Sequence, residues 1–169
     1  MSPEARFFER IVRTHYWRKM PEIVERITFG NRTFFSKYLR IDAPIDDNLV
    51  RRHLEGEIVV AHSLADDNGN VTQLLIDYNG DDPRRFRHHA LKMLAQEGFD
   101  DVSVFRSASP SHLHLYVFVE KQPLQSAIET GKIISEKLEA KLAKQWRIFP
   151  TDSLPEAYNI ANLPYEPFS

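Results

Sequence analysis

The 169-residue sequence contains no cysteine, and this absence narrows the chemistry available to the protein. Without cysteine, the chain has no disulfide, no thiolate zinc site and no cysteine nucleophile. Only six glycines are present. None of them belongs to a Walker P-loop, a G-x-S-x-G elbow or a dinucleotide-binding fingerprint. These motifs, and the enzyme classes that depend on them, are therefore excluded.

Strong net charge and long apolar runs are also missing. The formal net charge is −2, so the molecule as a whole is not drawn to nucleic acid or to an anionic membrane. A polyanion site would need a local basic cluster. The first residues, MSPEARFFERIVR, are charged and contain no long apolar stretch, which argues against a signal peptide or a membrane helix. We expect a cytoplasmic protein that makes no contact with a membrane.

The length and the hydrophobic fraction of 42% are typical of one compact globular domain. Within it, residues 3–26 carry apolar side chains at helical spacing, and Pro21 interrupts them. We therefore expect residues 1–30 to form an N-terminal helical segment and residues 31–169 to form the main α+β domain.

The main domain shows alternating signals for strands and helices. Short apolar runs at residues 57–64 and 71–78, joined by a polar loop, are typical of a β-hairpin. Helices are predicted over 82–98 and 123–144, and further strands over 102–106 and 112–120. Neighbouring strand pairs packed under helices favour an α+β fold with a mainly antiparallel sheet.

The segment RSASPSHLHLYVFV, residues 106–119, is the most informative part of the chain. His112 and His114 lie two residues apart at the start of an apolar run, and residues i and i+2 of a strand share a face. Imidazole binds phosphate when charged and a metal when neutral, so the pair marks a candidate site. The alternative is a hydrogen-bonded core histidine beside a solvated neighbour.

Two carboxylates are candidate metal ligands. Asp77 ends the apolar run LLIDYNG beside a turn, which is a common metal position and also a common turn position. Asp152 is a second, isolated acid in the segment FPTD. If these strand ends meet, Asp77, His112, His114 and Asp152 would offer nitrogen and oxygen ligands to a divalent metal.

Two segments resemble the archaeo-eukaryotic primase–polymerase superfamily. LLIDYNG stands where that superfamily has a pair of aspartates at a strand end, and RSASPSHLHLYVF resembles its Arg-Ser, turn and His-strand segment. The resemblance implies that His114 contacts a nucleotide phosphate in a pocket shaped by His112, Arg106 and Ser109. It also implies Mg²⁺ or Mn²⁺ as a cofactor, with Asp77 as a ligand and Asp152 as the candidate third acid.

The chain also resembles the DUF1882 family of small bacterial proteins, which has a primase–polymerase-like fold. The motifs are Tyr78-Asn79-Gly80, His112 to Tyr116, Trp146 to Pro150 and Asn159 to Tyr165. On these motifs the resemblance covers roughly residues 33 to 168, and the first ~30 residues carry no part of it.

One departure from the superfamily decides the expected function. Asn79 stands at the second position of the aspartate pair, and a neutral amide binds Mg²⁺ less well than a carboxylate does. We therefore expect a degenerate domain that binds a nucleotide or single-stranded nucleic acid without template-directed polymerisation.

Two alternatives stay open. One is an active metal-dependent nucleotidyltransferase or nuclease that uses Asp77, His114 and Asp152. The other is a non-catalytic module with structural histidines that binds a protein partner through an exposed aromatic tail, Tyr158 to Phe168.

Overall fold

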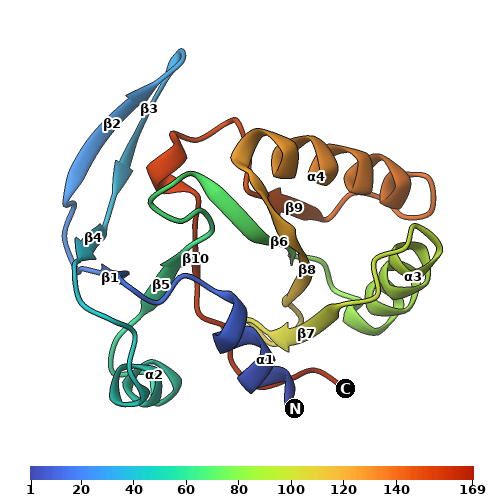
Figure 1. Cartoon of the computed structure of the whole chain (residues 1–169), viewed down its shortest axis with the longest axis horizontal. Helices are drawn as coiled ribbons and strands as arrows, with labels where there is room; N and C mark the ends of the chain where they lie inside the picture. Colours follow the sequence, from blue (N-terminus) through green and yellow to red (C-terminus); the bar gives the residue numbers. More distant parts are fainter. The chain divides into compact units, whose positions relative to one another are not determined.

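A computed structural model describes residues 1–169 and contains four α-helices and ten β-strands (Figure 1). The helices are α1 (Pro3–Arg10), α2 (Asp47–Leu54), α3 (Pro83–Gln96) and α4 (Leu124–Glu139). The strands are β1 (Tyr16–Lys19), β2 (Glu25–Phe29), β3 (Arg32–Ser36), β4 (Tyr38–Ile41), β5 (Val60–Ser63), β6 (Asn70–Tyr78), β7 (Val102–Arg106), β8 (Leu113–Pro123), β9 (Trp146–Phe149) and β10 (Ile160–Asn162). All strand pairs are antiparallel, so the predicted α+β class is confirmed.

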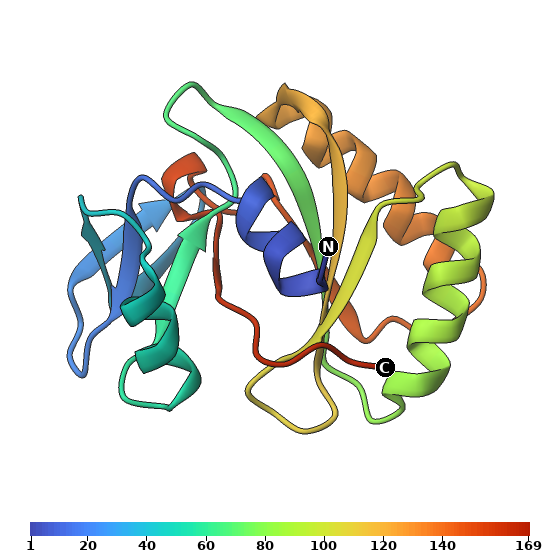
Figure 2. The same ribbon diagram turned by 60° about the horizontal axis from the view of Figure 1, so that its bottom comes forward.

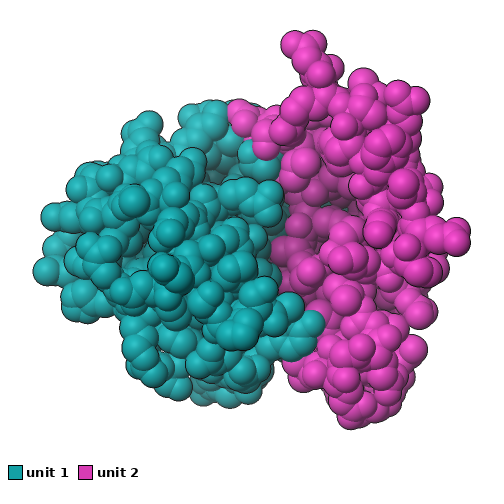
Figure 3. All heavy atoms as spheres, turned by 180° about the vertical axis from the view of Figure 1, so that it is seen from behind, with its two compact units in different colours: residues 1–11, 64–151, 164–169 teal, residues 12–63, 152–163 magenta.

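The chain forms two compact units, each built from separated stretches of sequence (Figure 3). Unit 1 contains residues 1–11, 64–151 and 164–169, and unit 2 contains residues 12–63 and 152–163. Residue 30, where the sequence analysis places a boundary, lies between β2 and β3 of unit 2.

Unit 1 is a four-stranded sheet in the order β7-β8-β6-β9. Because side chains alternate along a strand, one face of this sheet carries an apolar set that includes Ile76 and Leu115. This set packs against Phe86 and Leu94 of α3 and Ile134 of α4 in one buried core. Figure 2 shows both helices on the same side of the sheet.

Helix α1 covers part of the opposite face of the same sheet. Ser2 caps the helix by accepting a hydrogen bond from the backbone N–H of Ala5. The Phe7 ring is fully buried and lies 4.8 Å from the ring of Tyr116 and 5.6 Å from that of Phe105, centroid to centroid. These edge-to-face contacts place the apolar side of α1 on the sheet.

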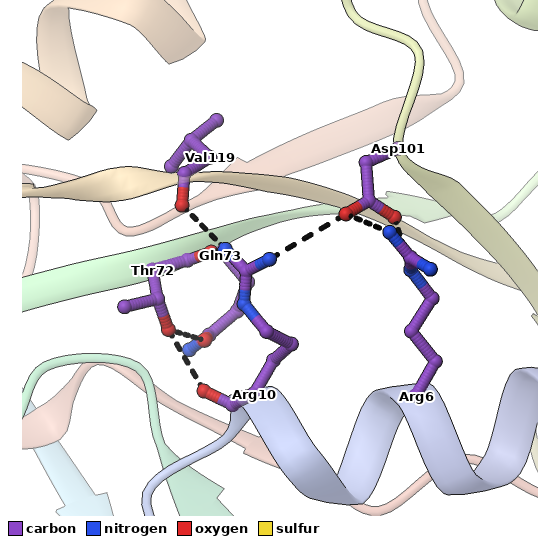
Figure 4. Close-up of polar contacts among 6 residues, drawn as sticks. All are labelled: Arg6, Arg10, Thr72, Gln73, Asp101 and Val119. Atoms are coloured by element: carbon purple, nitrogen blue, oxygen red, sulfur yellow. Dashed lines mark hydrogen bonds and ion pairs between the residues drawn. The ribbon is translucent and has the colours of Figure 1, made fainter. Parts of the chain in front are cut away.

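Arg10, the last residue of α1, donates hydrogen bonds to the sheet at a point where the strand pairing is irregular (Figure 4). The pairing of β6 with β8 shifts register on either side of Thr72, which leaves backbone carbonyls without ladder partners. The Arg10 guanidinium donates to the carbonyl oxygens of Thr72, at 3.3 Å, and Val119, at 2.6 Å. The Thr72 hydroxyl donates in return to the Arg10 carbonyl at 2.8 Å.

We expect Arg10→Ala to lower the free energy of unfolding by about 2 kcal/mol, because it leaves two carbonyls without their charged donor. The measurement is urea denaturation followed by circular dichroism. Arg6→Ala is the matched control, since Arg6 bonds only Asp101 and is largely exposed. Its expected effect is below about 1 kcal/mol, as for surface ion pairs. Equal effects of the two variants would contradict this role of Arg10.

Unit 2 contains a four-stranded sheet in the order β10-β5-β1-β4 and a separate hairpin of β2 and β3. Helix α2 is capped by Asp46, whose carboxylate accepts from the backbone N–H of Leu49. Its buried His53 accepts from the N–H of Val60 and bonds the carbonyl of Leu163. One imidazole therefore ties α2 to β5 and to the segment after β10.

Two expectations about local structure are wrong. The helix predicted over residues 3–26 ends at Arg10, and β1 and β2 follow it, because pairing with β4, β5 and β3 outweighs the helical spacing. The hairpin predicted from residues 57–64 and 71–78 does not form. Strand β5 pairs with β1 and β10, whereas β6 pairs with β8 and β9.

The C-terminal tail also differs from the exposed aromatic surface proposed as a partner site. Leu163 and Phe168 are buried, and residues 160–162 form β10 against β5. Helix α4 ends at Glu139, five residues before its predicted end. None of the helices is long and apolar enough to cross a membrane.

Candidate functional site

Three charged or titratable side chains stand in register on adjacent strands of unit 1. Asp77 on β6 faces His114 on β8 on one side and Arg147 on β9 on the other. Residues opposite each other in a ladder share a face, so the three side chains lie on the face opposite α3 and α4. We call His114, Asp77 and Arg147 the charged row.

The contacts within the charged row are close but longer than hydrogen bonds. His114 Nε2 lies 3.6 Å from Asp77 Oδ1, and a guanidinium nitrogen of Arg147 lies 3.8 Å from Asp77 Oδ2. Hydrogen bonds between nitrogen and oxygen are typically 2.7–3.2 Å. Asp77 therefore forms no hydrogen bond with either neighbour, and the charge of Arg147 attracts it electrostatically. The Arg147 side chain is 71% exposed, and its guanidinium lies 5.3 Å from the centroid of the Phe149 ring.

His114 is buried without a hydrogen bond. Only 7% of the residue is exposed, and its Nδ1 has no partner. Burial lowers the pKa of His114 below its ordinary value of 6.5, Asp77 opposes this shift and His112 adds to it. The imidazole is therefore neutral at pH 7. Buried polar atoms are bonded in most proteins, so this unbonded ring is the most unusual polar group of the site.

Tyr116 borders the site on the same strand as His114. Its ring is fully buried, 6.4 Å from the His114 ring between centroids. Burial raises the pKa of Tyr116 well above 10.0, and Asp77 raises it further. The phenol therefore stays neutral beside His114.

Arg106, expected in the same pocket, points to the other face of the sheet. It alternates with Phe105, which is the register partner of His114. Its guanidinium donates to the Pro110 carbonyl at 3.1 Å and lies 4.9 Å from the centroid of the Phe168 ring. The structure therefore separates Arg106 from His114.

His112 and Ser109 lie in the loop between β7 and β8. The backbone N–H of His112 donates to the Ser109 carbonyl at 3.1 Å, and the His112 carbonyl accepts from Ser107 at 3.1 Å. Both residues are half-buried. His112 is close enough to lower the pKa of His114, whereas Ser109 contributes its backbone to the loop.

The candidate metal ligands are not gathered into one group. Asp152 is exposed and belongs to unit 2, whereas Asp77 belongs to unit 1. The amide nitrogen of Asn79 lies 3.4 Å from the backbone carbonyl of Asp77, as donor to acceptor. No group of three or more His, Cys, Asp or Glu side chains among residues 1–169 is placed to hold a metal ion.

Arg147 is the residue of the site that sequence reasoning missed. The signal was available in part, because Arg147 alternates with the apolar Trp146 and Ile148 in a short run. The sequence of this run does not identify the strand with which it pairs. Pairing of β9 with β6, rather than with another strand, brings Arg147 beside Asp77.

Part of the chain matches a known protein family. Residues 8–73 match the model of the DUF1882 family, described as a domain of unknown function. The match confirms the resemblance to this family, but it covers a different part of the chain than expected. It begins at residue 8, not near residue 33, and ends before the motifs at Tyr78, His112, Trp146 and Asn159. No curated protein matches the chain.

Among solved structures, the chain is similar to the polymerase domain from Mycobacterium tuberculosis Ligase D in complex with DNA. The identity is 15% and the TM-score is 0.47, over 77% of this chain and 56% of that chain. The protein thus spans little more than half the length of that polymerase domain. A similarity at this level does not establish a shared activity.

Proposed function

We propose that unit 1 binds the phosphate groups of a nucleotide, together with one divalent metal ion, at the charged row. In this proposal the protein is a degenerate primase–polymerase-like domain without template-directed polymerase activity. The observation that carries the proposal is the state of His114, which is buried beside Asp77 with neither ring nitrogen hydrogen-bonded. A ligand oxygen beside Asp77 would give His114 Nε2 a hydrogen-bond partner, and Nε2 is the ring nitrogen that faces the carboxylate.

The charges of the row suit a metal–phosphate ligand better than a bare anion. His114 is neutral at pH 7, so Asp77 alone would repel phosphate. A bound Mg²⁺ or Mn²⁺ would neutralise Asp77 and attract phosphate oxygens. Mg²⁺ is commonly held by one or two carboxylates plus substrate phosphates, so Asp77 suffices for an ion that arrives with its nucleotide. Arg147 would add the second positive charge.

The residues of the charged row do not suit template-directed polymerisation. Catalysis by two metal ions roughly 3.5–4 Å apart needs ligands that hold both ions. Asp77 is a single carboxylate, and its neighbour Asn79 is a neutral amide. The row therefore supports binding and orientation of a phosphate rather than in-line transfer.

The test is calorimetric titration of the full chain with ATP in the presence and absence of Mn²⁺. We expect binding that depends on Mn²⁺, and a loss of affinity of about tenfold or more in His114→Gln, as for one hydrogen bond to a charged group. Asp77→Asn is expected to remove the dependence on Mn²⁺. Circular dichroism shows whether each variant is folded.

His88→Ala is the matched control, because His88 is exposed on α3. Its affinity for Mn²⁺ and ATP is expected to equal that of the unchanged protein. Undiminished affinity in a folded His114→Gln variant, or no binding of ATP by the unchanged protein, would refute the proposal.

A further inference from the structure

Unit 2 contains an aromatic groove that the charged row does not involve. The groove has a volume of about 370 Å³, within the range of small-molecule sites. Its lining includes the aromatic residues Phe34, Tyr38 and Tyr158 together with Lys19 and Lys37. Phe35 is 58% exposed, but it alternates with Phe34 along β3, so its ring lies on the opposite face of the hairpin.

The groove is built by strand pairing rather than by a loop. Lys19 on β1 stands opposite Tyr38 on β4, and Phe34 on β3 packs edge-to-face on Tyr158, 6.3 Å between centroids. The Tyr158 hydroxyl donates to Glu25, and the Tyr38 hydroxyl donates to Asn162 at 2.7 Å. These bonds hold the two phenol rings in place.

The segments of unit 2 that form the groove carry a net positive charge. Residues 12–41 and 152–163 contain seven Lys and Arg against four Asp and Glu, a net charge of +3, whereas the whole chain has −2. Neither Lys19 nor Lys37 forms an ion pair. One of the four acids, Glu25, already accepts the Tyr158 hydroxyl. The local field therefore favours an anionic ligand.

We propose that the aromatic groove binds single-stranded nucleic acid, with unpaired bases stacked on its rings and phosphates against Lys19 and Lys37. Aromatic platforms within a basic groove are the means by which proteins hold single strands regardless of sequence. A neutral apolar ligand would leave the two unpaired ammonium groups unused. A duplex would keep its bases stacked on each other and away from these rings.

The hydroxyl groups of the two tyrosines already donate hydrogen bonds within the protein, and this bears on whether the groove distinguishes RNA from DNA. Tyr38 and Tyr158 donate to Asn162 and Glu25, so these phenols offer no free donor to a ribose 2′-hydroxyl, the group that distinguishes RNA from DNA. The groove therefore recognises base faces and phosphates, and single strands of oligo-dT and oligo-U are expected to bind with similar affinity.

The test is fluorescence anisotropy of the full chain with a labelled 12-nucleotide oligo-dT. We expect Lys19→Glu/Lys37→Glu to weaken binding by about tenfold or more and to reduce its dependence on salt, because two phosphate contacts are lost. Phe34→Ala is expected to weaken binding by about tenfold, as for the loss of one stacked base, whereas Phe35→Ala, on the opposite face of the hairpin, is expected to leave the affinity within twofold. A 12-base-pair duplex is expected to bind at least about tenfold more weakly than the single strand.

Lys121→Glu/Lys141→Glu is the matched control, since it makes the same change of charge at exposed sites of unit 1. It is expected to leave the affinity for oligo-dT within twofold. Unchanged affinity in Lys19→Glu/Lys37→Glu, equal binding of the duplex, or no binding of oligo-dT by the unchanged protein would overturn the proposal. Binding of Mn²⁺ and ATP in the same variant reports separately on the charged row.

Discussion

Phe7→Ala is expected to lower the free energy of unfolding by about 4 kcal/mol, as for other fully buried phenylalanines. The ring has no exposed surface and packs against Phe105 and Tyr116 on the sheet of unit 1. The substitution removes the apolar contact of α1 and leaves a cavity beside Tyr116. Urea denaturation followed by circular dichroism measures the change, provided that the variant unfolds in a single transition.

The same substitution probes the site, because Tyr116 lies next to His114. Water entering the cavity would lessen the burial that lowers the pKa of His114. We expect that pKa, followed by the NMR chemical shifts of the imidazole, to move back toward 6.5. Phe8→Ala is the control on the same helix, since Phe8 is only half-buried, and less than half the loss of stability is expected. Similar losses in both variants would contradict the position of α1.

His53→Ala is expected to lower the free energy of unfolding of unit 2 by about 4 kcal/mol, because two buried hydrogen bonds are lost and a cavity remains. His53 Nδ1 accepts from the Val60 N–H at 3.0 Å, so the proton lies on Nε2, which donates to the Leu163 carbonyl at 2.8 Å. Truncation leaves both backbone groups buried without this partner. Arg51→Ala, exposed on the same helix, is expected to change stability by less than about 1 kcal/mol. A His53→Ala variant as stable as the Arg51→Ala variant would show that His53 does not tie α2 to the sheet.

The contribution of His53 depends on pH with a definite sign. Burial lowers the pKa of His53 below 6.5, against a smaller opposing effect of its bond to Leu163. The unfolded state therefore binds more protons than the folded state below about pH 6.5. The stabilisation is complete above that pH and is lost as the pH falls toward the folded pKa. The difference in stability between the unchanged protein and His53→Ala is expected to be smaller at pH 5.5 than at pH 7.5.

The sequence by itself determined the elements whose signals are local. Asp82 as a cap, Pro83 in the first turn and Gly98 after the last turn defined α3 closely, because capping bonds and backbone conformation depend on near neighbours. The strand over residues 102–106 and the α+β class were predicted for the same reason. The pairing of His114 with Asp77 was a reasonable hypothesis, since both were expected at strand ends.

Only the tertiary structure decided which strands pair and which side chains meet. The apolar runs around residues 60 and 74 look like one hairpin in sequence but join different sheets. Arg106, which follows the register partner of His114 on β7, points to the opposite face, whereas Arg147, far along the chain, lies beside Asp77. Alternation along a strand sets the face of each residue relative to its neighbours. Partner and register come from burial across the whole sheet, which no local pattern encodes.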